Sequence, residues 1–352
     1  MNTKIKNFFL VGGAAFLVLV LSGCTPGGGE GNILSRGFFK STDGGQSFSQ
    51  SEGSVLAGRS ILSLEINPNN NQEIFVGTSE GGLFKSPDEG KNWLADINNF
   101  KEVYDIEIIP NTSVIYIAAK QDGRGKLFKS ESNGESWVDV YTEKDGSSFL
   151  TSVAFHRNNP GSIYIANSKG GLFRTDDGGA SWKNLHWADS LIRKVEIDRV
   201  NPNIIYLATT NNGLLVSRDR GETFESVINR GYIYNIVVHP SREGFIYASS
   251  KDGLQRSSDA GVSWEVLNTL VRSEELVSRG LAINPKNPRE IYYTSGKAFY
   301  KSTNEGETWK PVPFNASASI ETIEVHPDNN QVIFLGTKNR KTGFKIVPGV
   351  NK

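Results

Sequence analysis

The sequence is poor in several residues on which common sites and scaffolds depend. It has one cysteine among 352 residues, so no intramolecular disulfide can form, and only four histidines. No Cys/His cluster and no His-Glu-x-x-His pattern is present, so we expect no metal, and no motif calls for a cofactor. Acidic and basic residues balance at 38 each and form no polybasic tract, which makes nucleic acid an unexpected partner.

The chain also lacks helical periodicity outside its N-terminus. There, Lys4 and Lys6 precede an apolar run that ends in Leu21-Ser22-Gly23-Cys24. A short charged region followed by such a run is typical of a secretory signal. The last four residues of the run resemble a bacterial lipobox, and in that family the cysteine becomes the acylated first residue.

The N-terminal segment therefore predicts a lipoprotein. We expect a signal peptide at 1–23, followed by a lipidated Cys24 and a flexible tether at 24–32. The alternative is an uncleaved anchor helix, which needs about 20 apolar residues, whereas glycines and a serine interrupt this run. The mature chain would then be extracytoplasmic, held to the bilayer by acylated Cys24. The membrane would be the outer leaflet of the cytoplasmic membrane or the outer membrane.

What the chain has in abundance is an eight-residue repeat. Seven copies occur, 40 to 45 residues apart. They are STDGGQSF (41–48), SPDEGKNW (86–93), SESNGESW (130–137), TDDGGASW (175–182), SRDRGETF (217–224), SSDAGVSW (257–264) and STNEGETW (302–309). Between copies lie short alternating or β-branched segments such as SLEINP and EIFVGT. A period of this length, built from short strands, is typical of four-stranded propeller blades.

The repeats predict an all-β fold, a single seven-bladed β-propeller over 33–348 with a tail at 349–352. The octets would be turns between the third and fourth strands of each blade. The chain starts in the middle of a blade and ends with first and second strands, so we expect the N- and C-terminal strands to close the ring. The segment GFKIV (343–347) remains as an unassigned extra copy of a third strand.

The octet resembles the Asp box, or BNR repeat, of the form Ser-x-Asp-x-Gly-x-Thr-Trp. The resemblance covers nearly the whole mature chain. It implies a propeller like those of sortilins, sialidases and two-propeller xyloglucanases, and like those of the photosystem II assembly factors. The third octet positions are interpreted as structural turn residues: Asp43, Asp88, Ser132, Asp177, Asp219, Asp259 and Asn304.

Residues that do not repeat are the better candidates for function. We expect the channel mouth on the face opposite the octets to carry the binding surface, because propeller ligands bind there. The candidates for this rim are Tyr104, Tyr141, Trp187, Arg193, Arg230, Tyr232, Tyr234, Arg272, Arg279 and Glu321. An Arg- and aromatic-rich rim suits contact with protein or glycan; the alternative is that these are ordinary solvated loop residues.

The sequence favours an interaction protein over an enzyme. It has no Arg-Ile-Pro motif of the sialidase type and length for only one propeller, so no catalytic residue is carried over by the resemblance. Glu321 and Asp105 lie near the expected mouth on different blades. We therefore expect a monomeric, non-catalytic, membrane-anchored propeller that binds an envelope protein or glycan. A sialidase-like or xyloglucanase-like glycoside hydrolase is the alternative.

Overall fold

The computed structural model describes residues 36–50, 54–95, 99–229, 231–272, 277–314, 316 and 318–339. All of them belong to one compact unit, Ile33–Lys352. The predicted signal peptide, Cys24, Arg230, the GFKIV segment and the tail lie outside the described residues. No described segment is a helix that is long and apolar enough to cross a bilayer.

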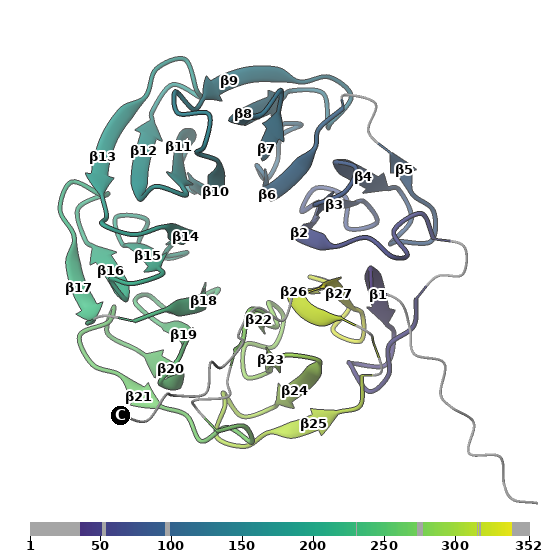
Figure 1. Cartoon of the computed structure of the whole chain (residues 1–352). Helices are drawn as coiled ribbons and strands as arrows, with labels where there is room; N and C mark the ends of the chain where they lie inside the picture. Colours follow the sequence, from purple (N-terminus) through teal and green to yellow (C-terminus); the bar gives the residue numbers. More distant parts are fainter. Residues whose placement is uncertain are drawn as a thin grey trace, which may run out of the picture. The chain divides into compact units, whose positions relative to one another are not determined.

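The described strands form seven antiparallel sheets around a central channel, which confirms the seven-bladed propeller (Figure 1). Six sheets have four strands each, which follow one another along the chain from the channel outward. Blade 1 contains β2 (Ile61–Ile66), β3 (Ile74–Thr78), β4 (Leu83–Ser86) and β5 (Leu94–Ala95). Blade 2 contains β6 (Glu102–Ile108), β7 (Ile115–Gln121), β8 (Arg124–Ser130) and β9 (Val138–Thr142). Blade 3 contains β10 (Leu150–His156), β11 (Asn159–Asn167), β12 (Gly171–Thr175) and β13 (Lys183–Trp187).

The next three blades follow the same order from the channel outward. Blade 4 contains β14 (Ile192–Ile197), β15 (Ile205–Thr209), β16 (Leu214–Ser217) and β17 (Glu225–Ile228). Blade 5 contains β18 (Ile233–Val238), β19 (Ile246–Ser250), β20 (Gly253–Ser257) and β21 (Glu265–Val266). Blade 6 contains β22 (Leu281–Ile283), β23 (Ile291–Ser295), β24 (Ala298–Ser302) and β25 (Lys310–Val312).

Blade 7 closes the ring with both ends of the chain, as predicted. Its sheet has the order β26 (Ser319–Val325), β27 (Ile333–Lys338) and β1 (Phe38–Ser41), and Lys40 of β1 is paired with Phe334 of β27. The fourth strand that the sequence led us to expect is reduced, in the described residues, to a single bridge between Lys40 and Ser49. Lys301 of blade 6 donates to the carbonyl oxygen of Gly44 at 3.1 Å and joins this blade to its neighbour.

Each octet forms the turn between the third and fourth strands of its blade. In blade 4, Asp219 Oδ1 accepts from the backbone N–H of Thr223 at 2.9 Å, and Oδ2 accepts from the Thr223 hydroxyl at 2.6 Å. These bonds, led by the one from the Thr223 hydroxyl, lower the pKa of Asp219 to about 2. In blade 6, Asn304 Oδ1 accepts from the Thr308 N–H at 3.0 Å. The same turn therefore forms with a neutral amide.

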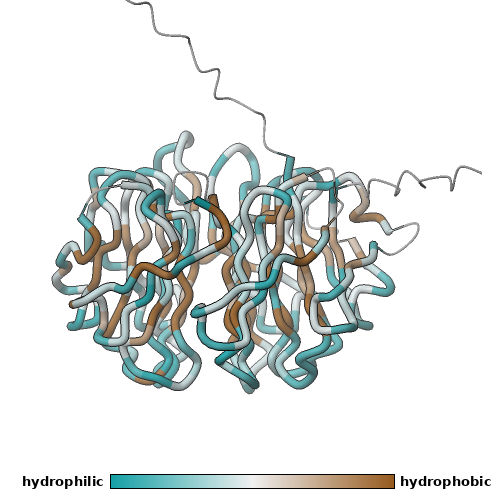
Figure 2. Tube along the Cα trace, turned by 90° about the horizontal axis from the view of Figure 1, so that it is seen from below, coloured by the Kyte–Doolittle hydropathy of each residue, from teal (hydrophilic) through white to brown (hydrophobic). Residues whose placement is uncertain are grey.

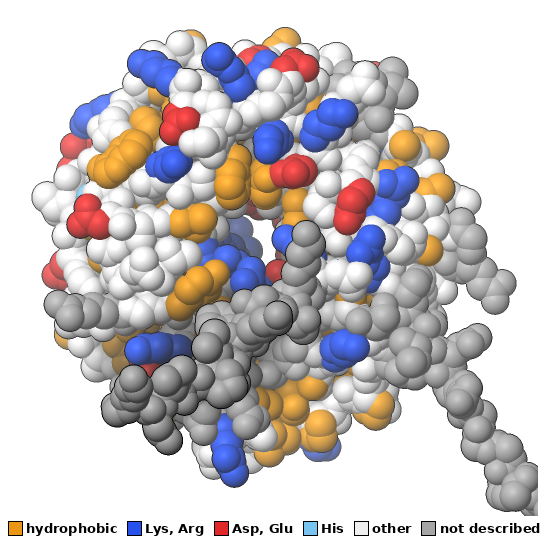
Figure 3. Space-filling model, in the orientation of Figure 1, with side chains coloured by type: hydrophobic (Ala, Val, Ile, Leu, Met, Phe, Trp, Pro, Cys, Tyr) orange, Lys and Arg blue, Asp and Glu red, His pale blue; other side chains and the backbone are white. Residues whose placement is uncertain are grey.

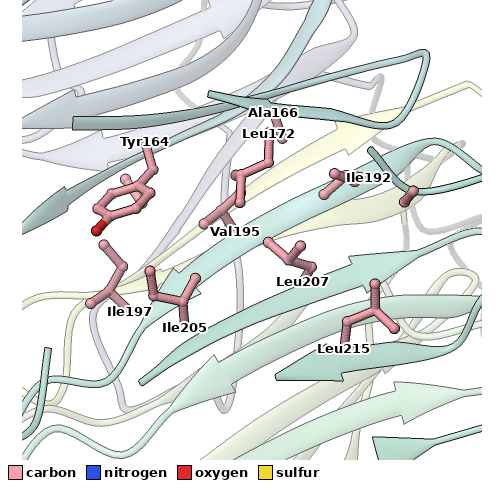
Figure 4. Close-up of a cluster of buried hydrophobic side chains, with 11 residues drawn as sticks. Tyr164, Ala166, Leu172, Ile192, Val195, Ile197, Ile205, Leu207 and Leu215 are labelled. Atoms are coloured by element: carbon pink, nitrogen blue, oxygen red, sulfur yellow. The ribbon is translucent and has the colours of Figure 1, made fainter. Parts of the chain in front are cut away.

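Apolar side chains fill the space between neighbouring blades. In Figure 2 the apolar segments run through the wall of the ring, and polar residues cover the loops at both ends. The cluster between blades 3 and 4 packs Tyr164 and Leu172 against Val195 and Leu207 (Figure 4). Both faces of each sheet are covered, so the second strands read as continuous apolar runs rather than as alternating ones. This packing holds the innermost strands at fixed positions around the channel.

Candidate functional site

The innermost strands share a β-bulge at one equivalent position. In β14, Ile192 is paired with Thr209 and Lys194 with Ala208, so Arg193 is an extra residue without a partner in the ladder. Bulges re-aim side chains and are frequent beside functional sites. Six inner strands have this irregularity, and their extra residues are Leu62, Tyr104, Thr151, Arg193, Tyr234 and Glu321.

These extra residues line the central channel, a cavity of about 480 Å³. Arg279 joins them from the segment just before β22. On the face shown in Figure 3, basic side chains gather around the opening. The extra residues and Arg279 together form what we call the mouth ring. It presents one side chain from each of the seven blades at one end of the channel.

Arg193 is held by two tyrosines of the neighbouring blade. Its Nη1 donates to the Tyr232 hydroxyl at 2.9 Å, and its Nε donates to the carbonyl oxygen of Tyr234 at 3.3 Å. The guanidinium also lies 5.5 Å from the centre of the Tyr232 ring, and the two tyrosine rings are 4.9 Å apart. These contacts fix the direction in which the cation points.

A second guanidinium lies near the first. Arg279 Nη1 is 3.6 Å from a carboxylate oxygen of Glu321, while the buried Arg279 Nε has no hydrogen-bond partner among the described residues. Burial, and then the nearby charge of Arg279, lowers the pKa of Arg193. Two cations thus lie near one carboxylate at the mouth ring, the carboxylate is paired with Arg279, and a donor of Arg279 remains available.

An aromatic pair lies on another part of the mouth ring. The rings of Tyr104 and Phe149 stack at 4.6 Å with an interplanar angle of 21°. The Tyr104 hydroxyl donates to Glu102, and burial together with this carboxylate raises the pKa of Tyr104. Phe149 precedes β10 and was not among the predicted residues. The mouth ring therefore combines two arginines with apolar ring surfaces.

Carboxylates line the channel below the mouth ring. Asp105 Oδ2 accepts from the Val153 N–H at 2.8 Å, and burial raises the pKa of Asp105 to about 6. Glu107 lies two residues after Asp105, and three other inner strands have a glutamate at the equivalent position. We call these four residues the carboxylate tier: Glu65, Glu107, Glu196 and Glu324. Burial raises the pKa of Glu324 to about 7.

One lysine and two arginines accompany these carboxylates. Lys194 Nζ lies 2.7 Å from Glu196 Oε1 and donates to the Ile236 carbonyl oxygen at 3.2 Å. Arg157 and Arg199 follow β10 and β14 at the far end of the channel.

The sequence analysis did not predict the carboxylate tier, although the sequence contains a signal for it. A glutamate stands between two apolar residues in SLEINP, DIEIIP, KVEIDR and TIEVHP, where strand alternation directs it away from the core.

The structure separates the predicted rim residues into two groups. Tyr104, Arg193, Tyr234, Arg279 and Glu321 all line the channel, and Tyr232 contacts Arg193. Tyr141 is instead part of β9 and packs against Phe173 and Trp182. Trp187 ends β13 rather than lying in a loop, and it is 55% exposed beside Phe173. Arg272 is exposed and is not part of the channel lining.

Metal chemistry receives no support from the described part of the chain, in which no group of three or more His, Cys, Asp or Glu side chains could hold an ion. Two of the histidines at the ends of inner strands, His239 and His326, accept hydrogen bonds within their own turns. His239 Nδ1 accepts from the N–H groups of Ser241 and Arg242, at 3.1 and 3.0 Å. What the channel offers chemically is anion binding at the mouth ring, above carboxylates that can bind protons.

Comparison with known proteins identifies relatives of two kinds. The family model for Sortilin-Vps10 (sortilin, neurotensin receptor 3) matches residues 125–252 and 252–346. The chain is 26% identical over 128 residues to the oligoxyloglucan-reducing end-specific xyloglucanase of Emericella nidulans, which covers 31% of this chain but 16% of that enzyme. The match thus spans about a sixth of the enzyme's length.

Solved structures share the propeller at low sequence identity. The GH74 xyloglucanase of Xanthomonas campestris has a TM-score of 0.67 at 17% identity, over 79% of this chain and 51% of the enzyme. YCF48 of Cyanidioschyzon merolae has a TM-score of 0.62 at 14% identity, over 79% of this chain and 96% of YCF48. A structure of YCF48 bound to D1 peptide has a TM-score of 0.58 at 14% identity, over 80% and 94% of the two chains. These likenesses show the shared fold.

Proposed function

This chain belongs to the Sortilin-Vps10 family, and we propose that it is a non-catalytic interaction protein that binds an anionic segment of a protein partner at the mouth ring. The observation that carries the proposal is the pair of guanidinium groups of Arg193 and Arg279, which lie near the carboxylate of Glu321 that pairs with Arg279. A guanidinium presents a planar set of donors that matches a carboxylate. The unpaired Nε of Arg279 adds a donor that a ligand can satisfy.

The surroundings of the arginines favour a peptide over an isolated ion. Tyr232, Tyr234 and the Tyr104–Phe149 pair offer ring surface around the cations. Aromatic and arginine side chains are the residues that dominate protein interfaces. A carboxylate from an acidic side chain or a chain terminus would bind the arginines, and the adjacent residues would pack on the rings. The YCF48 structure bound to a D1 peptide supports this choice, because a propeller of this fold is seen there with a peptide.

Peptide binding tests the proposal directly. The probes are three labelled nonapeptides: one rich in Asp and Glu with a free C-terminus, the same peptide as its C-terminal amide, and an Asn/Gln counterpart. Fluorescence anisotropy at low salt would give Kd values for wild type, Arg193→Gln and Arg279→Gln. The matched control is Arg289→Gln, which removes an exposed arginine outside the channel.

We expect the acidic peptide to bind more tightly than the neutral one, and each mouth variant to weaken binding by about 30-fold. That factor corresponds to about 2 kcal/mol for a truncated, partly buried charge pair. The control should match wild type. Equal binding of acidic and neutral peptides, or unchanged affinity in both mouth variants, would contradict the proposal.

A glycoside hydrolase is the second candidate, favoured by the match to xyloglucanases and by the raised pKa of Asp105. A carboxyl group with a pKa near 6 is suited to act as a general acid. The test is turnover of xyloglucan oligosaccharides by wild type and by Asp105→Asn. Turnover that the substitution abolishes would favour this enzyme over the interaction protein.

We also propose that acylated Cys24 tethers the propeller to a bacterial membrane. The lipobox-like sequence at 21–24 supports this, and a tether places the binding protein beside envelope partners. The measurement is membrane fractionation of wild type and Cys24→Ser. Release of the variant into the soluble fraction is expected, and unchanged retention would remove the lipid anchor from the proposal.

A further inference from the structure

The carboxylate tier is unevenly distributed around the channel. Glu324, Glu65 and Glu107 come from blades 7, 1 and 2, three consecutive blades, while Glu196 comes from blade 4. Glu196 is paired with Lys194 at 2.7 Å. Within the described part of the chain, no hydrogen bond or ion pair is formed by the carboxylates of Glu324, Glu65 and Glu107. Three acids without a hydrogen-bonded or ion-paired partner among the described residues therefore lie on adjoining blades.

The other ionisable groups of the channel offset these three acids only in part, because burial outweighs the nearby charges of Lys194 and Arg199. The groups that face the channel from its inner strands and the segments beside them are Glu65, Tyr104, Asp105, Glu107, Arg157, Arg193, Lys194, Glu196, Arg199, Tyr234, Arg279, Glu321 and Glu324. Lys194 is engaged by Glu196, and Arg157 and Arg199 are exposed at the far end. No histidine is part of this lining. Carboxyl groups are therefore the only candidates for titration near neutral pH within it.

We infer that protons bound by the carboxylate tier control the mouth ring, so that the channel accepts an anionic segment when these acids are neutral and disfavours it when they are ionised. The inference rests on the proposed function and adds its regulation. The geometry of the inner strands supplies the mechanism, because each glutamate of the tier lies three residues after the mouth-ring residue of its own strand. Charge in the tier therefore acts on the site through the channel interior.

The electrostatics of the enclosed channel agree with this mechanism. Burial, and then Glu324 and Glu107, raise the pKa of Glu65 well above its usual range, while burial and Asp105 do the same for Glu107. The pKa of Glu324 is raised to about 7 and that of Asp105 to about 6.

Because these carboxyl groups bind protons more readily than usual, the channel gains positive charge as the pH falls. Six carboxylates and five basic groups line it, which gives a net charge of −1 when all are ionised. With Glu65, Glu107, Glu324 and Asp105 neutral, two carboxylates remain and the net charge is +3. Low-dielectric walls focus such a field on the mouth.

The acidic partner remains negatively charged between pH 5.5 and 8.5. Exposed Asp and Glu side chains titrate near pH 4, so the acidic peptide stays anionic at pH 5.5. We expect its Kd to be at least about tenfold lower at pH 5.5 than at pH 8.5, because protonation of Glu324 and Asp105 makes the channel more positive while the ligand does not change.

The experiment measures the Kd of the acidic nonapeptide from pH 5.5 to 8.5 on the full chain. The variants are Glu65→Gln, Glu107→Gln, Glu324→Gln and the triple substitution, with Glu307→Gln as an exposed control outside the channel. The triple variant should bind at pH 8.5 about as tightly as wild type does at pH 5.5, and its pH dependence should be largely lost. Each single variant should lose part of the dependence, and circular dichroism would verify folding of every variant.

The possible outcomes separate the two proposals. Tight peptide binding with the same affinity at both pH values in wild type would overturn the regulation and leave the binding function intact. So would a triple variant that keeps the wild-type pH profile. Absence of binding by wild type at every pH would overturn the proposed function, and the regulation with it.

Discussion

A close contact beside the channel yields a sharp prediction at Gly77. In the second strand of all seven blades, the position three residues after an isoleucine is held by a short side chain: Gly77, Ala118, Ala166, Ala208, Ser249, Thr294 and Gly336. A Cβ on Gly77 would lie 2.5 Å from the carbonyl oxygen of Val103 and 2.8 Å from the Val103 Cβ, and it would also press on Ser63 Oγ. The serine side chain can rotate, but the Val103 backbone can yield only if β6 moves.

The expected cost of Gly77→Ala follows from this contact. Overpacking against fixed backbone costs about 1–3 kcal/mol. We place this substitution near 2 kcal/mol, which lowers the melting temperature by about 4–8 °C. Val103 directly precedes the extra residue Tyr104, so a shift of β6 also displaces the mouth ring. Gly77→Ala should therefore weaken acidic-peptide binding as well as stability.

The matched control is Gly146→Ala. Gly146 has no neighbouring atom within 4 Å of an added Cβ and has no positive φ. Its replacement should leave stability within about 0.5 kcal/mol or raise it slightly, because alanine restricts the unfolded chain. Urea unfolding of both variants gives the comparison. A Gly77→Ala protein as stable as Gly146→Ala would refute the view that inner strands are fixed by close inter-blade contact.

Three further predictions address the turns, the closure and the channel. Asp219→Ala should lose about 1 kcal/mol of unfolding free energy, whereas Asp219→Asn should lose little, because Asn304 forms the same turn; equal losses in urea unfolding would contradict this. Lys301→Met should cost about 1 kcal/mol by removing the bond to Gly44 between blades 6 and 7, and an unchanged urea midpoint would argue against that role. The raised pKa of Glu324 means that its carboxyl group binds a proton more tightly in the folded chain than in the unfolded chain. Its stability contribution is complete below about pH 4.5 and is lost as the pH rises through about 7, so Glu324→Gln should stabilise the protein at pH 8 by about 2 kcal/mol and have little effect at pH 4. Thermal melts at both pH values test this sign.

The architecture could be predicted from the sequence because each blade repeats the same local turn residues. Each octet satisfies its own turn with a side-chain oxygen and a residue of positive φ, so the turn does not depend on distant contacts. The number of octets and the incomplete blade at each end predicted the blade count and the closure. The reduced fourth strand of blade 7 was not predictable, because the octet ending at Phe48 has the same sequence signal as the others.

The channel was only partly predictable, for a different reason. The mouth ring depends on bulges, and a bulge arises from the fit of one strand to its neighbour rather than from any one residue type. Leu62, Tyr104 and Glu321 occupy the same bulge position, although they share no chemistry. The spacing of the blades indicates this position, but it does not separate the channel-lining residues from Tyr141 and Trp187, which lie in outer strands.

The carboxylate tier exposes a limit of reasoning from repeats. Residues that recur at one blade position were interpreted as structural, and this inference holds where the position faces a turn or a core. In the innermost strand, however, alternate positions face a shared channel, so a repeated glutamate brings like charges together instead of serving each blade separately. Glu324, Glu65 and Glu107 recur and yet raise one another's cost of ionisation. In a propeller, a residue that repeats between blades serves packing. A residue that repeats on the innermost strands instead places several ionisable groups in the same channel, because every blade contributes one strand to it.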